Sequence, residues 1–122
     1  MSRQSAVHIK RAYEPPKSSD GTRVLVDRIW PRGLGRERAA VDVWLKEIAP
    51  TNELRKWFGH DPARWNDFQT RYRAELKRSD GAVNELRALI RKGPVTLLYG
   101  ARDEAHNNAV ALAAYLKSKR PP

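Results

Sequence analysis

Two short apolar segments constrain the fold of this chain more than any other feature of its sequence. One is Val24-Leu25-Val26, inside a predicted strand that spans Arg23–Ile29, and the other is the predicted strand Val95–Tyr99. A continuous apolar core is typical of strands buried on both faces, and such strands occur mainly in parallel sheets. The two segments therefore predict a parallel sheet that other elements cover on both sides.

Alternation of apolar and polar residues predicts two further strands. They lie at Val7–Ala12 and at Val41–Lys46, where a helix is the alternative for the second. The Pro-, Ser- and Gly-containing segment Tyr13–Gly21 is predicted to be a loop, and Leu34–Ala40 is predicted to be a loop or a short helical turn.

Four helices are predicted after Pro50 from capping and terminating residues. The first helix runs from Thr51 to Phe58 and is ended by Gly59, and the second is capped by Asp61 with Pro62 at its first position. The third helix is capped by Asp80 and ended by Gly93 and Pro94, and the fourth runs from Asp103 to Lys117. Strands that alternate with helices predict a single α/β domain over residues 1–122, with a central, mostly parallel sheet of about four strands flanked by helices. Residues 1–5 and 118–122 are expected to fray.

Two loops follow the carboxyl ends of predicted strands, Asp27–Arg36 and Gly100–Asn107. Ligands of open α/β sheets bind beyond the carboxyl ends of the strands. If the strands are parallel, these two loops converge at one edge of the sheet. We therefore expect the binding site at that edge.

The first loop carries four residues suited to an anionic ligand, namely Arg28, Trp30, Arg32 and Arg36. Arginine forks match phosphate or carboxylate oxygens bidentately, and a tryptophan offers a stacking face. The equally weighted alternative is structural. In that case Trp30 plugs the core and Asp27 pairs locally with an arginine.

The second loop places a histidine three residues after an aspartate. If Asp103 caps the final helix, His106 lies in its first turn, where free backbone amides favour anions. His106 can then act as a neutral donor or a base that Asp103 orients, so these two are the candidate catalytic residues. An ordinary capping and packing role is the favoured alternative. Tyr99, Arg102 and Asn107 are candidate ligand-binding neighbours.

His60 and Asp61 lie in the turn between two predicted helices, where they can complete the rim of the site. A structural corner is the favoured alternative for both. A metal site is not expected, because the three histidines, at positions 8, 60 and 106, are dispersed and lack the spacing of a ligand pair. No nucleotide- or cofactor-binding motif is present either, so no cofactor is expected.

Charge and composition narrow the class of partner. The formal net charge of +10 favours anions such as nucleic acid, phosphorylated metabolites or acidic proteins, with plain solvation as the alternative. The absence of cysteine excludes disulfides, thiol catalysis and cysteine-ligated zinc. No apolar run approaches the roughly 20 residues that span a bilayer, and the first residues lack a signal-peptide core. A cytoplasmic protein without a membrane partner is expected.

Three long stretches of the chain contain rare residues in a specific order. They read GTRVLVDRIWPRG, LRKWFGHDPARWNDFQTRY and VTLLYGARDEAHNNAVAL. Together they resemble the YeaO-like branch of domain-of-unknown-function family 488 (DUF488), over nearly the whole chain from Val7 to Leu116. The resemblance implies a small bacterial cytoplasmic α/β domain with a central sheet, and it implies no established reaction.

The chain departs from the wider family at one chemically important place. Many members resemble a pattern in which Cys-His-Arg follows the last strand, whereas this chain has Ala105-His106-Asn107 there. Only the histidine matches, so a cysteine-based mechanism is excluded for this chain. Pro31 and Arg32 do match the wider pattern.

These observations lead to an anion- or phosphate-binding α/β protein, whose ligand is a phosphorylated or other anionic small molecule. Arg28 and Arg32 are the expected anion clamps, Trp30 is the expected stacking wall, and His106 with Asp103 is the expected polar centre of the site. If the site is catalytic, acid–base work by the histidine is the expected chemistry. The alternatives are a basic nucleic-acid-binding or regulatory module, and a structural or interaction domain without a small ligand.

Overall fold

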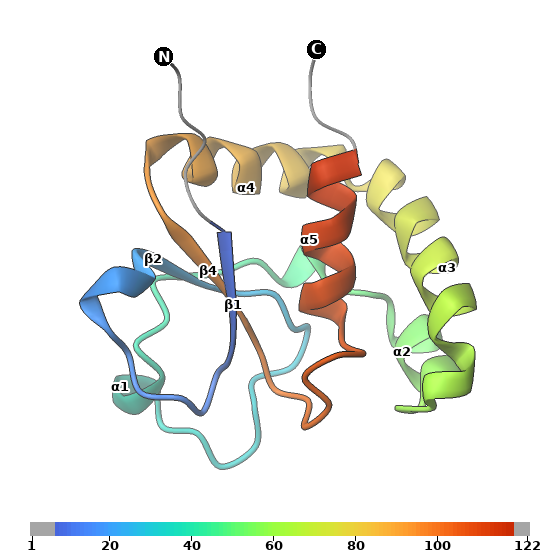
Figure 1. The fold of residues 1–122 in the computed structure, drawn as a ribbon, viewed down its shortest axis with the longest axis horizontal. Coiled ribbons are helices and arrows are strands. Elements are labelled where there is room, and N and C mark those ends of the chain that lie inside the picture. The colour runs from blue at the N-terminus through green and yellow to red at the C-terminus, as the bar shows by residue number, and fades with distance from the viewer. Residues whose placement is uncertain (1–6, 119–122) are drawn as a thin grey trace.

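A four-stranded, all-parallel sheet forms the centre of the protein, in a computed structural model that describes residues 7–118 (Figure 1). Its strands are β1 (Val7–Arg11), β2 (Thr22–Leu25), β3 (Val43–Trp44) and β4 (Val95–Tyr99). The spatial order is β1-β4-β2-β3, with Val24 paired to Leu97 on one side and to Val43 on the other. Every residue of β4 is buried, which explains its continuous apolar run.

Helices cover one face of the sheet, and loops with a single short helix cover the other. The helices are α1 (Arg36–Ala39), α2 (Asn52–Phe58), α3 (Trp65–Arg78), α4 (Asp80–Lys92) and α5 (Asn108–Ser118), with single 3-10 turns at Ser18–Asp20, Lys46–Ile48 and Pro62–Arg64. The main core lies between the sheet and α2 to α5, where Val24 and Leu97 meet Leu112. On the other face, Leu25 and Leu98 pack against Trp30 and Trp44. The predicted α/β domain with a central parallel sheet of four strands is therefore confirmed, and both faces of β2 and β4 are covered.

Several predicted helix ends are confirmed by side-chain and backbone geometry. The Thr51 hydroxyl accepts a hydrogen bond from the Leu54 amide at 3.1 Å, and Gly59 ends α2 in the left-handed conformation with φ of 55°. Asp61 caps the 3-10 turn that leads into α3, where its carboxylate accepts from the Ala63 amide at 3.0 Å. Asp80, in contrast, is the first residue of α4 and not its cap.

Three strands are shorter than predicted, and β1 lacks only the last predicted residue, Ala12. β2 ends at Leu25 rather than Ile29, although the Val26 amide still donates to the Leu98 carbonyl at 3.1 Å. The chain then leaves the sheet, and Ile29 is 57% exposed. β3 is limited to Val43–Trp44 because Leu45 leads into the 3-10 turn.

The final helix begins at Asn108 and not at Asp103. The Asp103 carboxylate instead closes a tight turn, because its Oδ1 accepts from the amides of Ala105 and His106, both at 2.9 Å. The cap of α5 is Asn107, whose Oδ1 accepts from the Val110 amide at 3.0 Å. His106 therefore precedes the helix and does not lie in its first turn.

The chain ends were expected to fray, but residues 1–5 and 119–122 lie outside the described residues. Ser118 is the last residue of α5. Between residues 7 and 118, no helix has the length and apolar character needed to cross a membrane.

A buried ion network lies at the start of β2. The Asp20 carboxylate accepts from Arg23 Nη1 at 2.6 Å and from Lys10 Nζ at 3.0 Å. Arg23 is only 3% exposed, and its Nη2 also donates to the Ala39 carbonyl at 2.8 Å. These contacts tie β1, β2 and α1 together with a fully hydrogen-bonded buried charge.

Candidate functional site

A pocket of about 470 Å³ opens at the carboxyl ends of β2 and β4. It is lined by the segment after β2, by the turns that flank α2, and by the loop between β4 and α5, with Tyr13 and Phe68 at its sides. Figure 1 shows the loops that follow β2 and β4 together at the end of the molecule opposite α4. The two loops therefore converge, as a parallel sheet requires.

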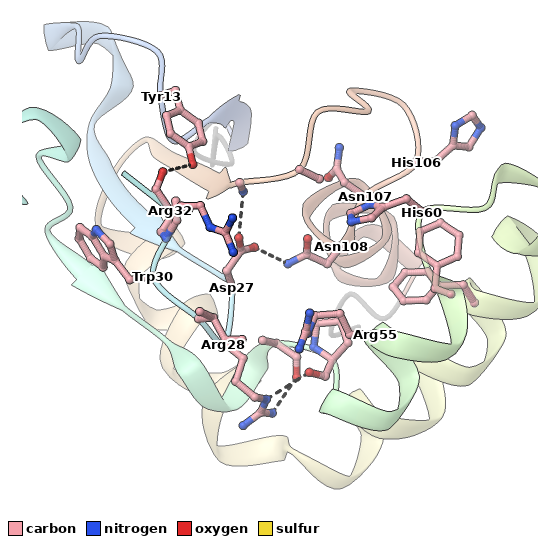
Figure 2. A pocket seen from close by; sticks show the side chains of 18 residues that line it. Tyr13, Asp27, Arg28, Trp30, Arg32, Arg55, His60, His106, Asn107 and Asn108 are labelled. Atoms are coloured by element: carbon pink, nitrogen blue, oxygen red, sulfur yellow. Dashed lines mark hydrogen bonds between the residues drawn. The ribbon is translucent and has the colours of Figure 1, made fainter. Parts of the chain in front are cut away.

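Asp27 joins these two loops (Figure 2). Its Oδ2 accepts from the Gly100 amide at 2.9 Å, and its Oδ1 accepts from Asn108 Nδ2 at 3.0 Å. Burial raises the pKa of Asp27, and the hydrogen bonds from Asn108 and Gly100 and the positive charge of Arg55 only partly oppose this. A carboxylate with a raised pKa in a pocket is a typical feature of functional sites.

No cation forms an ion pair with Asp27 among residues 7–118, if 4.0 Å is taken as the limit. The local Asp27–arginine pair considered from the sequence is therefore wrong. A glycine at position 100 fits this arrangement, because a Cβ there would lie 3.1 Å from Asp27 Oδ2. The carboxylate is held by the Gly100 backbone amide and by the Asn108 side-chain amide.

Three arginines border the pocket, and they are held differently. Arg28 donates to the backbone carbonyls of Pro50 at 3.2 Å and Ala49 at 3.1 Å, so it fixes the turn before α2 as well as lining the pocket. Arg32 and Arg55 are both exposed and line the pocket. Arg32 lies in the loop after β2, and Arg55 lies in α2. The Arg32 backbone is fixed by Tyr13, whose hydroxyl donates to the Arg32 carbonyl at 2.6 Å.

Trp30 both stabilises the loop after β2 and lines the pocket. Its Nε1 donates to the Leu34 carbonyl at 2.7 Å, and its ring packs edge-on against Trp44 with centroids 5.3 Å apart. The Arg36 guanidinium lies 4.6 Å from the Trp30 ring centroid, in a cation–π contact. Arg36 therefore supports the tryptophan and does not line the pocket.

A histidine–aspartate pair lies at the pocket on the side of α5. His106 Nδ1 is 2.9 Å from Asp103 Oδ2, and this hydrogen bond lowers the pKa of Asp103. The His106 ring packs edge-on against Trp65, with centroids 5.3 Å apart. These contacts fix the ring so that the histidine lines the pocket while Asp103 stays outside it.

His60 lies in the turn after α2 and also lines the pocket. Its φ of 58° places it in the left-handed region, which is unusual for a residue with a side chain. Gly59 immediately before it has a φ of 55°, so the two residues make a sharp turn. Backbone strain of this kind is often found at ligand sites.

The structure divides the predicted site residues into two groups. Those that line the pocket are Arg28, Trp30, Arg32, His60, His106 and Asn107. Those that do not are Arg36, Asp61, Tyr99, Arg102 and Asp103. Three polar residues that the sequence reasoning missed are Asp27, Arg55 and Asn108. Asp27 and Gly100 lie 73 positions apart in the chain, so only the order of the strands could have indicated their contact.

The lining as a whole combines cations, one buried carboxylate and apolar walls. The apolar walls include Phe58 and Phe68 beside Trp30. In the part of the chain that the structure describes, no group of three metal-ligating side chains comes together. The arrangement can hold a small molecule that carries a negative charge and an apolar or planar portion.

The raised pKa of Asp27 predicts how its replacement changes stability with pH. Because the folded protein binds this proton more tightly, the contribution of Asp27 to stability is full below its unfolded-state pKa of 3.8 and is lost as pH rises through its folded-state pKa. We therefore expect the Asp27→Asn variant to gain stability relative to the native chain as the pH rises above the unfolded-state pKa of 3.8. Urea unfolding at several pH values measures this difference, and a constant difference would contradict it.

The comparisons with known proteins cover almost the whole chain. The family model DUF488-N3i, described as "Inactive DUF488-N3 subclade", matches residues 6–120. The chain is 42% identical to the uncharacterized protein YeaO of Escherichia coli (strain K12), over 92% of this chain and 97% of that protein. It is 41% identical to the uncharacterized protein Rv3073c of Mycobacterium tuberculosis, over 98% of this chain and 100% of that protein. No solved structure matches the chain significantly.

Proposed function

Since this chain belongs to the DUF488 family as a YeaO-like member, we propose that it binds a small anionic molecule, such as a phosphorylated metabolite, in the pocket at the carboxyl ends of β2 and β4. The observation that carries this proposal is the meeting of Arg28, Arg32 and Arg55 around one pocket. Two of these guanidinium groups are exposed and have the fork geometry that matches phosphate or carboxylate oxygens.

The remaining lining supports a ligand larger than a bare ion. His60 and His106 add imidazole rings on the side opposite Arg32 (Figure 2), and Phe58 and Trp30 add apolar surface. A pocket of about 470 Å³ is within the range of small-molecule sites. We therefore expect an organic phosphate or carboxylate rather than inorganic phosphate alone.

Binding without chemistry is the version of the proposal that we favour. The matching family model is described as inactive, and Ala105 stands where the wider family pattern has cysteine. One observation favours a second candidate, acid–base chemistry: His106 is held by Asp103 at 2.9 Å and lines the pocket. If a His106→Ala variant keeps full ligand affinity, then His106 neither binds nor orients the ligand.

A thermal-shift screen tests the proposal directly. Phosphorylated metabolites and small carboxylates are added to the native chain, and the hits are titrated by calorimetry. We expect Arg32→Gln to weaken a hit by about tenfold or more, because a charge-assisted hydrogen bond is lost. The matched control is Arg73→Gln, since Arg73 is exposed on α3 and does not line the pocket.

Two results would contradict the proposal. One is that no anion shifts the melting temperature. The other is that Arg32→Gln and Arg73→Gln bind every hit as well as the native chain. Binding to random duplex with a steep log-linear loss on added salt, together with no response to small anions, would favour the nucleic-acid alternative.

A further inference from the structure

Asp27 places a negative charge inside a pocket that otherwise carries positive charge, and this contrast constrains the ligand. On the basis of the proposed function, we infer that Asp27 is a specificity-determining residue, and that the ligand is an anion that also carries a hydroxyl or ammonium donor. Phosphorylated polyols are the simplest members of this chemical class.

Asp27 already accepts two hydrogen bonds from the protein. An ionised carboxylate accepts at about four lone-pair positions and donates none. The Gly100 amide and Asn108 Nδ2 occupy one position on each oxygen, at 2.9 and 3.0 Å. About two positions therefore remain, on a side chain that lines the pocket.

The surrounding cations do not take up this remaining capacity. Arg28 donates to the carbonyls of Ala49 and Pro50. Among residues 7–118, no cation lies within ion-pair distance of the Asp27 carboxylate. Water can therefore occupy the remaining acceptor positions before a ligand binds.

A ligand that fills the pocket must replace that water. If it presents a hydroxyl or ammonium group to Asp27, the carboxylate keeps its hydrogen bonds. If it presents only a methylene group, a desolvated charge is left unpaired, and affinity falls. The arginines and Asp27 thus select for two features of one molecule, an anionic end and a donor.

Two simple phosphate esters distinguish the contribution of the anionic group from that of the hydroxyl donor. Glycerol phosphate and n-propyl phosphate carry the same phosphate monoester, and only the first has hydroxyl groups. We titrate both into the full chain by calorimetry. We expect the native chain to bind glycerol phosphate about tenfold tighter or more, and Asp27→Asn to reduce this preference to about threefold or less.

The outcomes distinguish this inference from the proposed function. We expect Asp27→Asn to bind n-propyl phosphate at least as tightly as the native chain, because no carboxylate is then left unpaired, and this result also shows that the variant pocket is intact. Arg32→Gln is expected to weaken both esters by the same factor. Equal affinity of the native chain for the two esters would overturn the role of Asp27 and leave the anion site standing. Binding of neither ester would overturn both. If Asp27→Asn does not fold, the ratio measured on the native chain still decides the ligand class.

Discussion

Replacing Gly21 with alanine is expected to lower the free energy of unfolding by about 4 kcal/mol or more, among the largest losses that a single methyl group can cause. Gly21 has a φ of 66°, and an added Cβ would lie 2.1 Å from the Pro94 carbonyl oxygen. That oxygen accepts from the Thr22 amide at 3.0 Å, in the contact that leads into the β2–β4 pairing. The backbone must therefore shift at the start of both central strands.

Urea unfolding followed by circular dichroism measures this loss. The matched control is Gly81→Ala in α4, where no atom lies within 4 Å of the added methyl group. Alanine is the better helix former, so the control is expected to gain about 0.5–1 kcal/mol. A loss below about 1 kcal/mol in Gly21→Ala would contradict a steric clash with the Pro94 carbonyl oxygen.

The second large effect is expected at the buried ion network. Asp20→Asn keeps the shape of the side chain but leaves Arg23, which is 3% exposed, without its carboxylate partner. Removal of one member of a buried pair costs about 3 kcal/mol, because the remaining charge stays desolvated. The control Glu85→Gln lies on the exposed side of α4 and is expected to change stability by less than about 0.5 kcal/mol.

The same carboxyl group gives the protein a defined sensitivity to acid. Burial alone would raise the pKa of Asp20, but hydrogen bonds from the Lys17 amide, Lys10 and Arg23 outweigh it and lower the pKa to about 2. Because the folded-state pKa is depressed, this stabilisation is present above the unfolded-state value of 3.8 and is lost as pH falls toward about 2. The native chain should lose its advantage over Asp20→Asn in this window, and a parallel pH dependence of the two proteins would contradict the assignment.

The sequence predicted the centre of the fold well because the determining signals are local. The apolar run Val95–Tyr99 matches β4 residue for residue, and the caps at Thr51 and Asp61 need only neighbours two or three positions away. The start of α5 was wrong because Asp103 and Asn107 are both good caps, and only the folded loop decides between them.

The site was harder to predict, because its central contacts join distant segments. The convergence of the two loops followed from the parallel sheet, and Arg32, His60 and His106 do line one pocket. Asp27 was missed because its partners, Gly100 and Asn108, lie 73 and 81 positions away. No local pattern distinguishes such a carboxylate from one that pairs with a nearby arginine.

The central position of β4 in the sheet has a consequence for folding during synthesis on the ribosome. β1 and β2 do not pair with each other, and each pairs with β4, which is the last strand to be synthesised. Until β4 is synthesised, β1 has no partner in the sheet, and β2 can pair only with the two-residue strand β3. The complete sheet can therefore form only after β4 has been synthesised, and it then closes the long loops that separate β4 from β1 and β2 in one cooperative step.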